Sequence, residues 1–190
     1  MLSKKKHFKK TFYPYLIVIL LSGSLVDSVW SQDVNRLDEN YGFQNYEFGD
    51  LKQDYPNCSF ETVKDGGAEK CIKKRSHSIG EIESNKVHLW FIDSQLMRVD
   101  IYFDIKERSE LSTAVHAIFG DNYHLRDKPG MNNRTLIWEA NKVSLHFASF
   151  YNYEHILTDA DSYSKLKFMV NDFDEKLEKQ QQEQYSPSDF

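Results

Sequence analysis

The chain has 190 residues, 40 % of them hydrophobic and 14 % aromatic, with 24 Lys and Arg against 29 Asp and Glu. This length and apolar content suffice for one hydrophobic core. The acidic balance disfavours nucleic acid as a partner, because that affinity comes from Lys and Arg that neutralise phosphates. Beyond residue 31 the sequence also lacks the motifs Gly-x-Ser-x-Gly, His-Glu-x-x-His, Gly-x-x-x-x-Gly-Lys and Gly-x-Gly-x-x-Gly, which excludes the common hydrolase, zinc-protease and nucleotide-binding signatures.

The N-terminus has the layout of a secretory signal peptide over 1–31. The basic stretch MLSKKKHFKK precedes the apolar YLIVILL, and small residues follow up to Ser31. Because Pro14 and Ser22-Gly23-Ser24 interrupt the apolar run, it falls short of the ~20 residues of a membrane-spanning helix. We therefore expect cleavage after Ser31, a periplasmic or secreted protein, and no stable membrane span after cleavage. An uncleaved anchor is the alternative. The remaining 19 Lys and Arg against 28 Asp and Glu give a net charge of −9.

Cys58 and Cys71 are the two cysteines of the chain. In an oxidising compartment, an even pair at this spacing is typical of one disulfide. The intervening VKDGG supplies a turn that can bring the two ends together. Free thiols are the alternative, and a redox-active pair is disfavoured because Cys-x-x-Cys spacing is absent.

The rest of the chain divides into three regions. Residues 32–47 are polar with scattered aromatics, and we expect an irregular lead-in that holds at most a short edge strand. A single α+β domain is predicted over 48–178. A disordered tail is predicted over 179–190, where Gln and charged residues predominate.

Residues 87–104, VHLWFIDSQLMRVDIYFD, alternate between two faces as a β-hairpin does. With 93–95 as a three-residue loop, the expected inward pairs are Phe91 with Met97, Leu89 with Val99, and Val87 with Ile101. The same register places Trp90 opposite Arg98 and His88 opposite Asp100. These would be a cation–π pair and a charge-assisted pair, so the second face has a structural reason for its mixed composition.

The stretch ERSELSTAVHAIFGD predicts an amphipathic helix, because Leu111, Ala114, Val115 and Ile118 recur at helical spacing. Ser109 is the expected N-cap, and Gly120 is expected to end the helix.

A second hairpin is predicted in TLIWEANKVSLHFASF, with a two-residue turn at 141–142 in which Asn141 takes positive φ. The expected inward pairs are Ala140 with Val143, Trp138 with Leu145, and Leu136 with Phe147. Residues 162–170 predict a last strand with Leu166, Phe168 and Val170 inward. A short C-terminal helix, capped at Asn171, is expected to dock through Phe173 and Leu177.

These elements predict an α+β fold, a two-layer sandwich in which a mostly antiparallel sheet has one main helix packed on one face and a short C-terminal helix. The other face would be open and would carry His88, Trp90, Arg98, Tyr102, Ile137, His146 and Phe150. A contiguous aromatic patch on an open face is typical of a binding surface. The alternative is that the N-terminal segment or the C-terminal helix folds over it.

The sequence predicts no metal site and no cofactor. His88 and His146 would share the open face, but an isolated histidine is more often a satisfied or solvated side chain than a ligand. Asp100 and Asp104, on one face of one strand, are a weak candidate for paired catalytic carboxylates.

The stretches LSTAVHAIFGDNY and TLIWEANKVSLHF, within residues 86–150, carry a resemblance to a known pattern. The region resembles uncharacterised small exported bacterial α+β proteins, in which a hairpin, a helix ending in a Gly-containing turn and a Trp-bearing hairpin recur. The resemblance implies this architecture and a bacterial envelope setting. It implies no activity and no site residue.

The sequence thus favours an exported, soluble, non-enzymatic protein that binds an envelope component or an extracellular protein through the open sheet face. Aromatic residues and Arg dominate interface energetics, so the expected binding residues are Trp90, Arg98, Tyr102, Phe150, His88 and His146. The alternative is a hydrolase or metal-dependent enzyme with a site around His88, Asp100 and His146.

Overall fold

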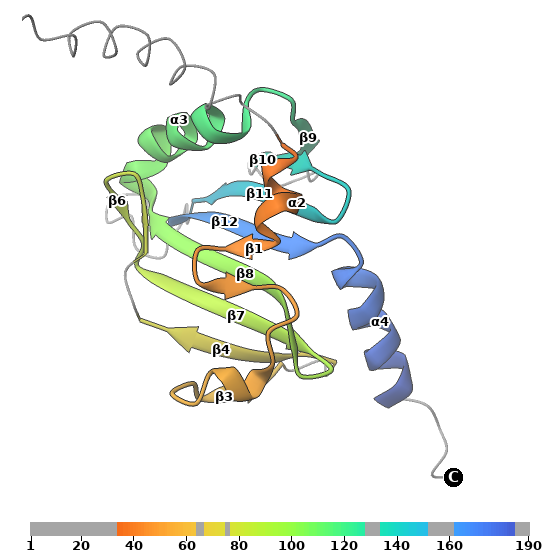
Figure 1. Ribbon diagram of the computed structural model, residues 1–190. Helices are drawn as coiled ribbons and strands as arrows, with labels where there is room; N and C mark the ends of the chain where they lie inside the picture. The colour runs from red at the N-terminus through yellow and green to blue at the C-terminus, as the bar shows by residue number, and fades with distance from the viewer. Residues whose placement is uncertain (1–33, 64–66, 75–76, 128–133, 152–161, 185–190) are drawn as a thin grey trace, which may run out of the picture. The chain divides into compact units, whose positions relative to one another are not determined.

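The chain divides into two units, residues 1–31 and 32–190. A computed structural model describes residues 34–63, 67–74, 77–127, 134–151 and 162–184 (Figure 1). The predicted signal peptide lies outside the described residues. The described part of the second unit consists mainly of antiparallel strands with a few helices, which confirms the predicted α+β class.

The centre of the fold is an eight-stranded sheet in which all neighbouring strands are antiparallel. In spatial order its strands are β3 (Phe60–Thr62), β4 (Glu69–Lys73), β7 (Lys86–Ile92), β8 (Gln95–Asp104), β12 (Tyr163–Val170), β11 (Val143–Phe150), β10 (Arg134–Glu139) and β9 (His124–Asp127). The predicted last strand is confirmed as β12. It lies between β8 and β11, so that the end of the chain joins the two predicted hairpins into one sheet (Figure 1).

The β7–β8 hairpin confirms most of the predicted register. Val87 lies opposite Ile101, Leu89 opposite Val99, His88 opposite Asp100 and Trp90 opposite Arg98. The predicted three-residue loop is wrong, because the turn has two residues, Asp93 and Ser94, with φ of 49° and 64°. Two successive positive φ values match the twist of paired strands. A register shift after Trp90 then places Leu96, instead of Met97, opposite Phe91.

The β10–β11 hairpin has the predicted register. Trp138 lies opposite Leu145 and Leu136 opposite Phe147. Asn141, however, does not take the expected positive φ. The turn is held from outside instead: the Asp38 carboxylate accepts hydrogen bonds from the backbone N–H groups of Asn141, Lys142 and Val143 at 2.9, 2.8 and 3.0 Å.

One face of the sheet, here called the inner face, carries the apolar core. Its buried side chains include Leu89, Val99, Ile101, Leu145, Leu166 and Phe168. Helix α3 (Arg108–Phe119) packs on it through the buried Leu111 and Val115. Gly120 ends the helix as predicted, with φ of 76°. The predicted N-cap is wrong: a 3-10 turn, η3 (Ile105–Glu107), precedes α3, and its cap is Asp104, whose carboxylate accepts the backbone N–H of Lys106.

The N-terminal segment completes the covering of the inner face. It contains α2 (Arg36–Asn40), β1 (Gly42–Phe43), β2 (Tyr46–Glu47) and the 3-10 turn η2 (Lys52–Asp54). Contacts join α2 to β11, β1 to β12 and β2 to β8 (Figure 1). Leu37, Tyr46 and Phe48 are buried in the core. The predicted irregular lead-in over 32–47 is therefore, from residue 34 on, a structural part of the domain.

The disulfide between Cys58 and Cys71 is confirmed, with Cα atoms 5.8 Å apart. It lies at the edge of the sheet, where β3 pairs with β4. A separate small hairpin, β5 (Ser78–Ile79) and β6 (Ile82–Glu83), turns at Gly80, which has φ of 62°.

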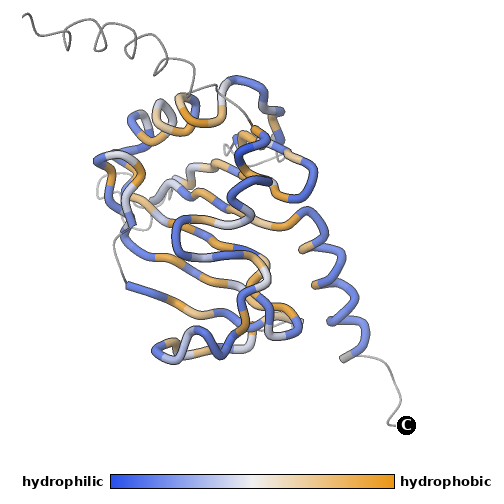
Figure 2. Tube along the Cα trace, in the orientation of Figure 1, coloured by the Kyte–Doolittle hydropathy of each residue, from blue (hydrophilic) through white to orange (hydrophobic). Residues whose placement is uncertain are grey.

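The C-terminal helix α4 (Phe173–Gln184) follows β12 directly. Phe173 is fully buried and Leu177 is half-buried, as the predicted docking through these two residues requires. Figure 2 shows the rest of α4 as mainly hydrophilic. The helix continues to Gln184, so the tail predicted as disordered from residue 179 is helical over 179–184. Within the described ranges, no helix combines the length and the apolar character needed to cross a membrane.

Candidate functional site

The outer face, defined as the side of the sheet opposite α3, carries all six predicted binding residues. His88 and Trp90 come from β7, Arg98 and Tyr102 from β8, and His146 and Phe150 from β11. Alternation along each strand places them on one side, because successive side chains point to opposite faces. The structure divides them into three groups with different surroundings: one beside α4, one in the centre of the sheet, and one toward the end of the sheet near Phe150.

Beside α4, Arg98 is enclosed by two aromatic rings. Its guanidinium carbon lies 4.4 Å from the centre of the Trp90 ring and 5.4 Å from that of the Phe173 ring. Such contacts stabilise by roughly 0.5–2 kcal/mol each. Trp90 and Arg98 therefore attach α4 to the sheet. The sequence left open that the C-terminal helix folds over the predicted open face. Around Trp90 and Arg98, helix α4 does lie against that face.

In the centre of the outer face, Asp100 is fully buried. The Arg98 guanidinium donates two hydrogen bonds to its carboxylate, from Nε at 2.7 Å and from Nη2 at 2.5 Å, and Lys165 Nζ lies 3.9 Å away. Burying a carboxylate is costly unless it is paired and hydrogen-bonded. Arg98 thus supports Asp100 as well as α4, and the carboxylate is occupied by this pairing.

The predicted alternative enzyme site consists of His88, Asp100 and His146. These three residues lie along one line across the strands. His88 faces Asp100, but Lys167 of β12 lies between Asp100 and His146. Burial lowers the pKa of His88 to about 4 and that of His146 to about 3, with Lys167 adding to the effect on His146. Both imidazoles are therefore neutral at pH 7, and the strand order keeps His146 apart from the carboxylate.

Lys167 itself is shifted by this environment, because burial and the neighbouring Arg98 lower its pKa to about 8. Across the described ranges, no three His, Cys, Asp or Glu side chains come together as a metal-binding group. The carboxylates of Asp100 and Asp104 are both engaged, one by Arg98 and the other by the N–H of Lys106. The described residues therefore do not bring His88, Asp100 and His146 together as one cluster.

The third group forms what we call the aromatic row: His88, Tyr102, Tyr163 and Phe150. Its neighbouring ring centres are 4.6, 5.2 and 4.9 Å apart, and the row crosses β7, β8, β12 and β11. All four side chains are partly exposed. Burial raises the pKa of both tyrosines, which therefore remain neutral phenols.

Two lysine side chains lie beside the aromatic row. Lys86 Nζ lies 4.7 Å from the centre of the Tyr102 ring, and Lys165 Nζ lies 5.3 Å from that of Phe150. Two buried polar atoms at this face, His88 Nε2 and Trp90 Nε1, have no hydrogen-bond partner among the described residues. Buried polar groups are normally paired, so such exceptions draw attention to the surface where they occur.

Tyr163 belongs to the aromatic row but is absent from the predicted binding residues. The alternation of β12 contained the signal, because Leu166, Phe168 and Val170 point inward and odd-numbered residues must then point outward. What the sequence could not supply was the position of β12 between β8 and β11, which brings Tyr163 beside Tyr102 and Phe150.

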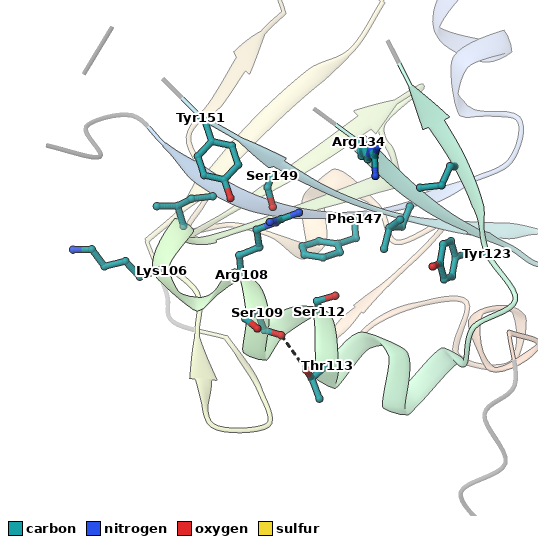
Figure 3. A pocket seen from close by; sticks show the side chains of 13 residues that line it. Lys106, Arg108, Ser109, Ser112, Thr113, Tyr123, Arg134, Phe147, Ser149 and Tyr151 are labelled. Atoms are coloured by element: carbon teal, nitrogen blue, oxygen red, sulfur yellow. Dashed lines mark hydrogen bonds between the residues drawn. The ribbon is translucent and has the colours of Figure 1, made fainter. Parts of the chain in front are cut away.

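Two of the hollows formed by the described residues lie on the inner face. A groove of about 640 Å³ lies between η3, the first half of α3, and β9, β10 and β11 (Figure 3). A second hollow of about 510 Å³, mainly apolar, lies between α2, the β1–β2 hairpin and the end of α3. No local sequence pattern indicates either hollow, because their lining residues come from separate parts of the chain.

Comparison with known proteins yields little. No protein-family model matches the chain, and no curated protein matches it. A solved structure of a GTP binding regulator from Thermotoga maritima aligns with 77 % of this chain and 82 % of its own, at 10 % sequence identity and a TM-score of 0.35. A score this low does not establish a shared fold, so no property of that protein is carried over.

Proposed function

We propose that this protein is an exported, non-catalytic binding domain whose partner contacts the aromatic row of the outer face. The observation that carries the proposal is the row itself: four partly exposed rings in contact across four neighbouring strands. The predicted open face is not open throughout, because Ile137 and His146 on it are buried. Helix α4 contacts Trp90 and Arg98, whereas the ring contacts of the row to other described residues are within the row and with Lys86 and Lys165.

Export is supported by three observations. The N-terminal sequence has the order of a signal peptide. The disulfide between Cys58 and Cys71 is compatible with a periplasmic or extracellular location. The resemblance of residues 86–150 to small exported bacterial proteins agrees with this setting.

The partner that fits the row best is an envelope or extracellular protein with an acidic, partly apolar contact surface. Tyrosine and phenylalanine rings supply large contact area at a low cost in side-chain entropy. Lys86 and Lys165 flank the rings, and Asp100 beside the row is buried and paired with Arg98. A surface of this charge would attract acidic groups.

The test is a crosslinking capture from envelope extract with residues 32–190 as bait. The decisive variant is Tyr102→Ala/Phe150→Ala, which interrupts the row at two positions without touching Arg98. The matched control is Tyr41→Ala/Leu51→Ala, which removes two large side chains, each 40 % exposed, that lie outside the outer-face strands.

We expect one protein to be captured by the wild type and by the control, and lost with the decisive variant while its melting temperature stays within a few degrees of the wild-type value. The captured protein is then purified and titrated against all three forms. Equal affinity of the purified partner for the wild type and for the row variant would refute a role for the aromatic row.

A further inference from the structure

The second hollow lies between the sheet and the elements that cover its inner face. Its described lining residues come from β12, from α3, from α2, from the β1–β2 hairpin and from β5. Figure 1 shows α2 and β1 over strands β11 and β12, with which they are in contact. The volume of about 510 Å³ is within the range of small-molecule sites, which is roughly 300–1,000 Å³.

The interior of the second hollow is apolar and belongs to the core. Leu166 of β12, Val115 of α3 and Leu37 of α2 line it, and each of these side chains is at most 2 % exposed. The other apolar lining residues are Phe43, Ile79, Ile118, Phe119 and Phe168. Protein interiors are close-packed, with few voids larger than a water molecule. A hollow of this size against core side chains therefore suits the apolar part of a ligand.

The polar lining residues all come from the N-terminal segment and form a rim. Glu39 and Asn40 belong to α2, Gln44 and Glu47 belong to the β1–β2 hairpin, and all four are exposed. A polar rim next to an apolar interior is the usual composition of a small-molecule site, in which a few polar groups orient the ligand.

Both parts of the rim are held in place. The β1–β2 hairpin is attached to β5, because the side-chain amide of Gln44 donates to the carbonyl oxygen of Ser78 at 2.9 Å. Its Phe43 ring packs on that of Phe168 in β12, with ring centres 4.9 Å apart. Helix α2 is attached through Asp38 to the turn between β10 and β11. A rim that is fixed before the ligand arrives lowers the entropic cost of binding.

The carboxylates of Glu39 and Glu47 give the rim a negative charge. Among the described residues that line the second hollow, none is Lys, Arg or His. Neither carboxylate forms a hydrogen bond or an ion pair with another residue in the described part of the chain. The buried Asp100, in contrast, is paired with Arg98. Two unpaired carboxylates beside apolar surface favour a ligand that carries a positive charge.

From this geometry we propose that the second hollow binds a small amphiphilic organic cation, a protonated amine with an apolar body. The ammonium group lies at Glu39 and Glu47, and the body contacts Phe43, Ile118 and Phe119. An ammonium group has several N–H donors and can therefore bond two carboxylates at once. An organic anion of the same shape would meet like charge at the rim, so the site discriminates by charge as well as by shape.

Isothermal titration calorimetry of residues 32–190 tests this proposal with three probes that share one ring system. Naphthylmethylamine is a cation at neutral pH, naphthylmethanol is neutral and naphthylacetate is an anion. We expect the wild type to bind the amine at one site per chain, the alcohol more weakly, and the carboxylate most weakly.

Two double variants test the role of charge. Glu39→Gln/Glu47→Gln removes both rim carboxylates and keeps the size of the side chains. Glu110→Gln/Glu178→Gln is the matched control, because it removes two negative charges from exposed positions outside the second hollow. The rim variant should weaken amine binding by at least about tenfold, as loss of charge-assisted hydrogen bonds does, and leave the alcohol within about twofold. The control should leave all three probes within about twofold.

Two filling variants test the location. Ile118→Trp narrows the second hollow from α3, and Asn40→Trp narrows it from the rim, at an exposed position where a larger side chain does not disturb the core. Both should weaken the amine and the alcohol alike. Melting temperatures show whether each variant is folded, and Asn40→Trp decides the location if Ile118→Trp does not fold.

The proposal would be overturned if the folded wild type did not bind the amine, or if it bound the amine and the carboxylate equally. Equal amine affinity of the wild type and Glu39→Gln/Glu47→Gln would also overturn it. Equal losses with the rim variant and the control would show general charge attraction, and undiminished binding by Asn40→Trp would place the probe elsewhere; either result contradicts the proposal. The aromatic row is intact in every variant, so failure here is distinguishable from failure of the proposed function.

Discussion

The carboxylate of Asp38 accepts the backbone N–H of Lys142 at 2.8 Å, and so connects the short N-terminal helix to the turn between β10 and β11. The same carboxylate accepts the neighbouring N–H groups of Asn141 and Val143. A turn without positive φ is thereby held by a side chain from about a hundred residues earlier in the chain.

We expect Asp38→Ala to lower the free energy of unfolding by roughly 1–3 kcal/mol, because three backbone donors lose a charged acceptor and two of them can turn to water. Chemical denaturation measures this change. Glu39→Ala, at the exposed neighbouring position, is the control and should change stability by less than about 0.5 kcal/mol. Equal effects of the two substitutions would argue against this role for Asp38.

Arg98→Met should destabilise the protein by about 3 kcal/mol or more, because it removes both hydrogen bonds that the guanidinium donates to the fully buried Asp100. The double variant Arg98→Met/Asp100→Leu should recover part of this loss, since no buried charge then remains unpaired. Lys86→Met on the same face is the control, with an expected effect of at most about 1 kcal/mol. A double variant less stable than Arg98→Met would contradict this account.

His146 should make the protein less stable in mild acid. Its pKa is lowered from 6.5 to about 3 in the folded state, so below pH 6.5 the unfolded chain binds a proton that the folded chain does not. Stability is therefore unaffected above pH 6.5 and falls as the pH decreases below it. Between pH 6.5 and 5 this amounts to roughly 2 kcal/mol.

Denaturant titrations at these two pH values should show that His146→Asn reduces the pH dependence, whatever its effect on absolute stability. His124→Asn serves as the control, because His124 is an exposed histidine on the next strand but one. The His124→Asn control should keep the wild-type pH dependence of stability. A His146→Asn variant that also keeps it would contradict this interpretation.

Reduction of the Cys58–Cys71 disulfide should cost roughly 3 kcal/mol, since the bond closes a short loop at the edge of the sheet. The measurement is the unfolding midpoint with and without dithiothreitol. Cys58→Ala/Cys71→Ala should be less stable than the oxidised wild type and insensitive to the reductant. A wild type that is equally stable in both conditions would show that the bond does not constrain the unfolded chain.

Local patterns predicted the secondary structure of the central strands well. Alternation placed Leu89 opposite Val99 and Trp138 opposite Leu145, because a shift of one residue would have moved charged side chains into the core. Patterns did not predict turn geometry: the Asp93-Ser94 turn has one residue fewer than expected, and the turn after Ala140 depends on Asp38. The second turn is decided by hydrogen bonds to a residue that is distant in the sequence.

The sequence by itself determined the α+β class, the disulfide partners, the β10–β11 register and most of the β7–β8 register, because each follows from parity, spacing or alternation over short distances. Only the tertiary structure decided that β12 lies between β8 and β11, that the segment from residue 34 covers the inner face, and that Phe173 brings α4 against Arg98. These are contacts between distant segments. The groove beside α3 and the position of Tyr163 in the aromatic row follow from them and have no local signature in the chain.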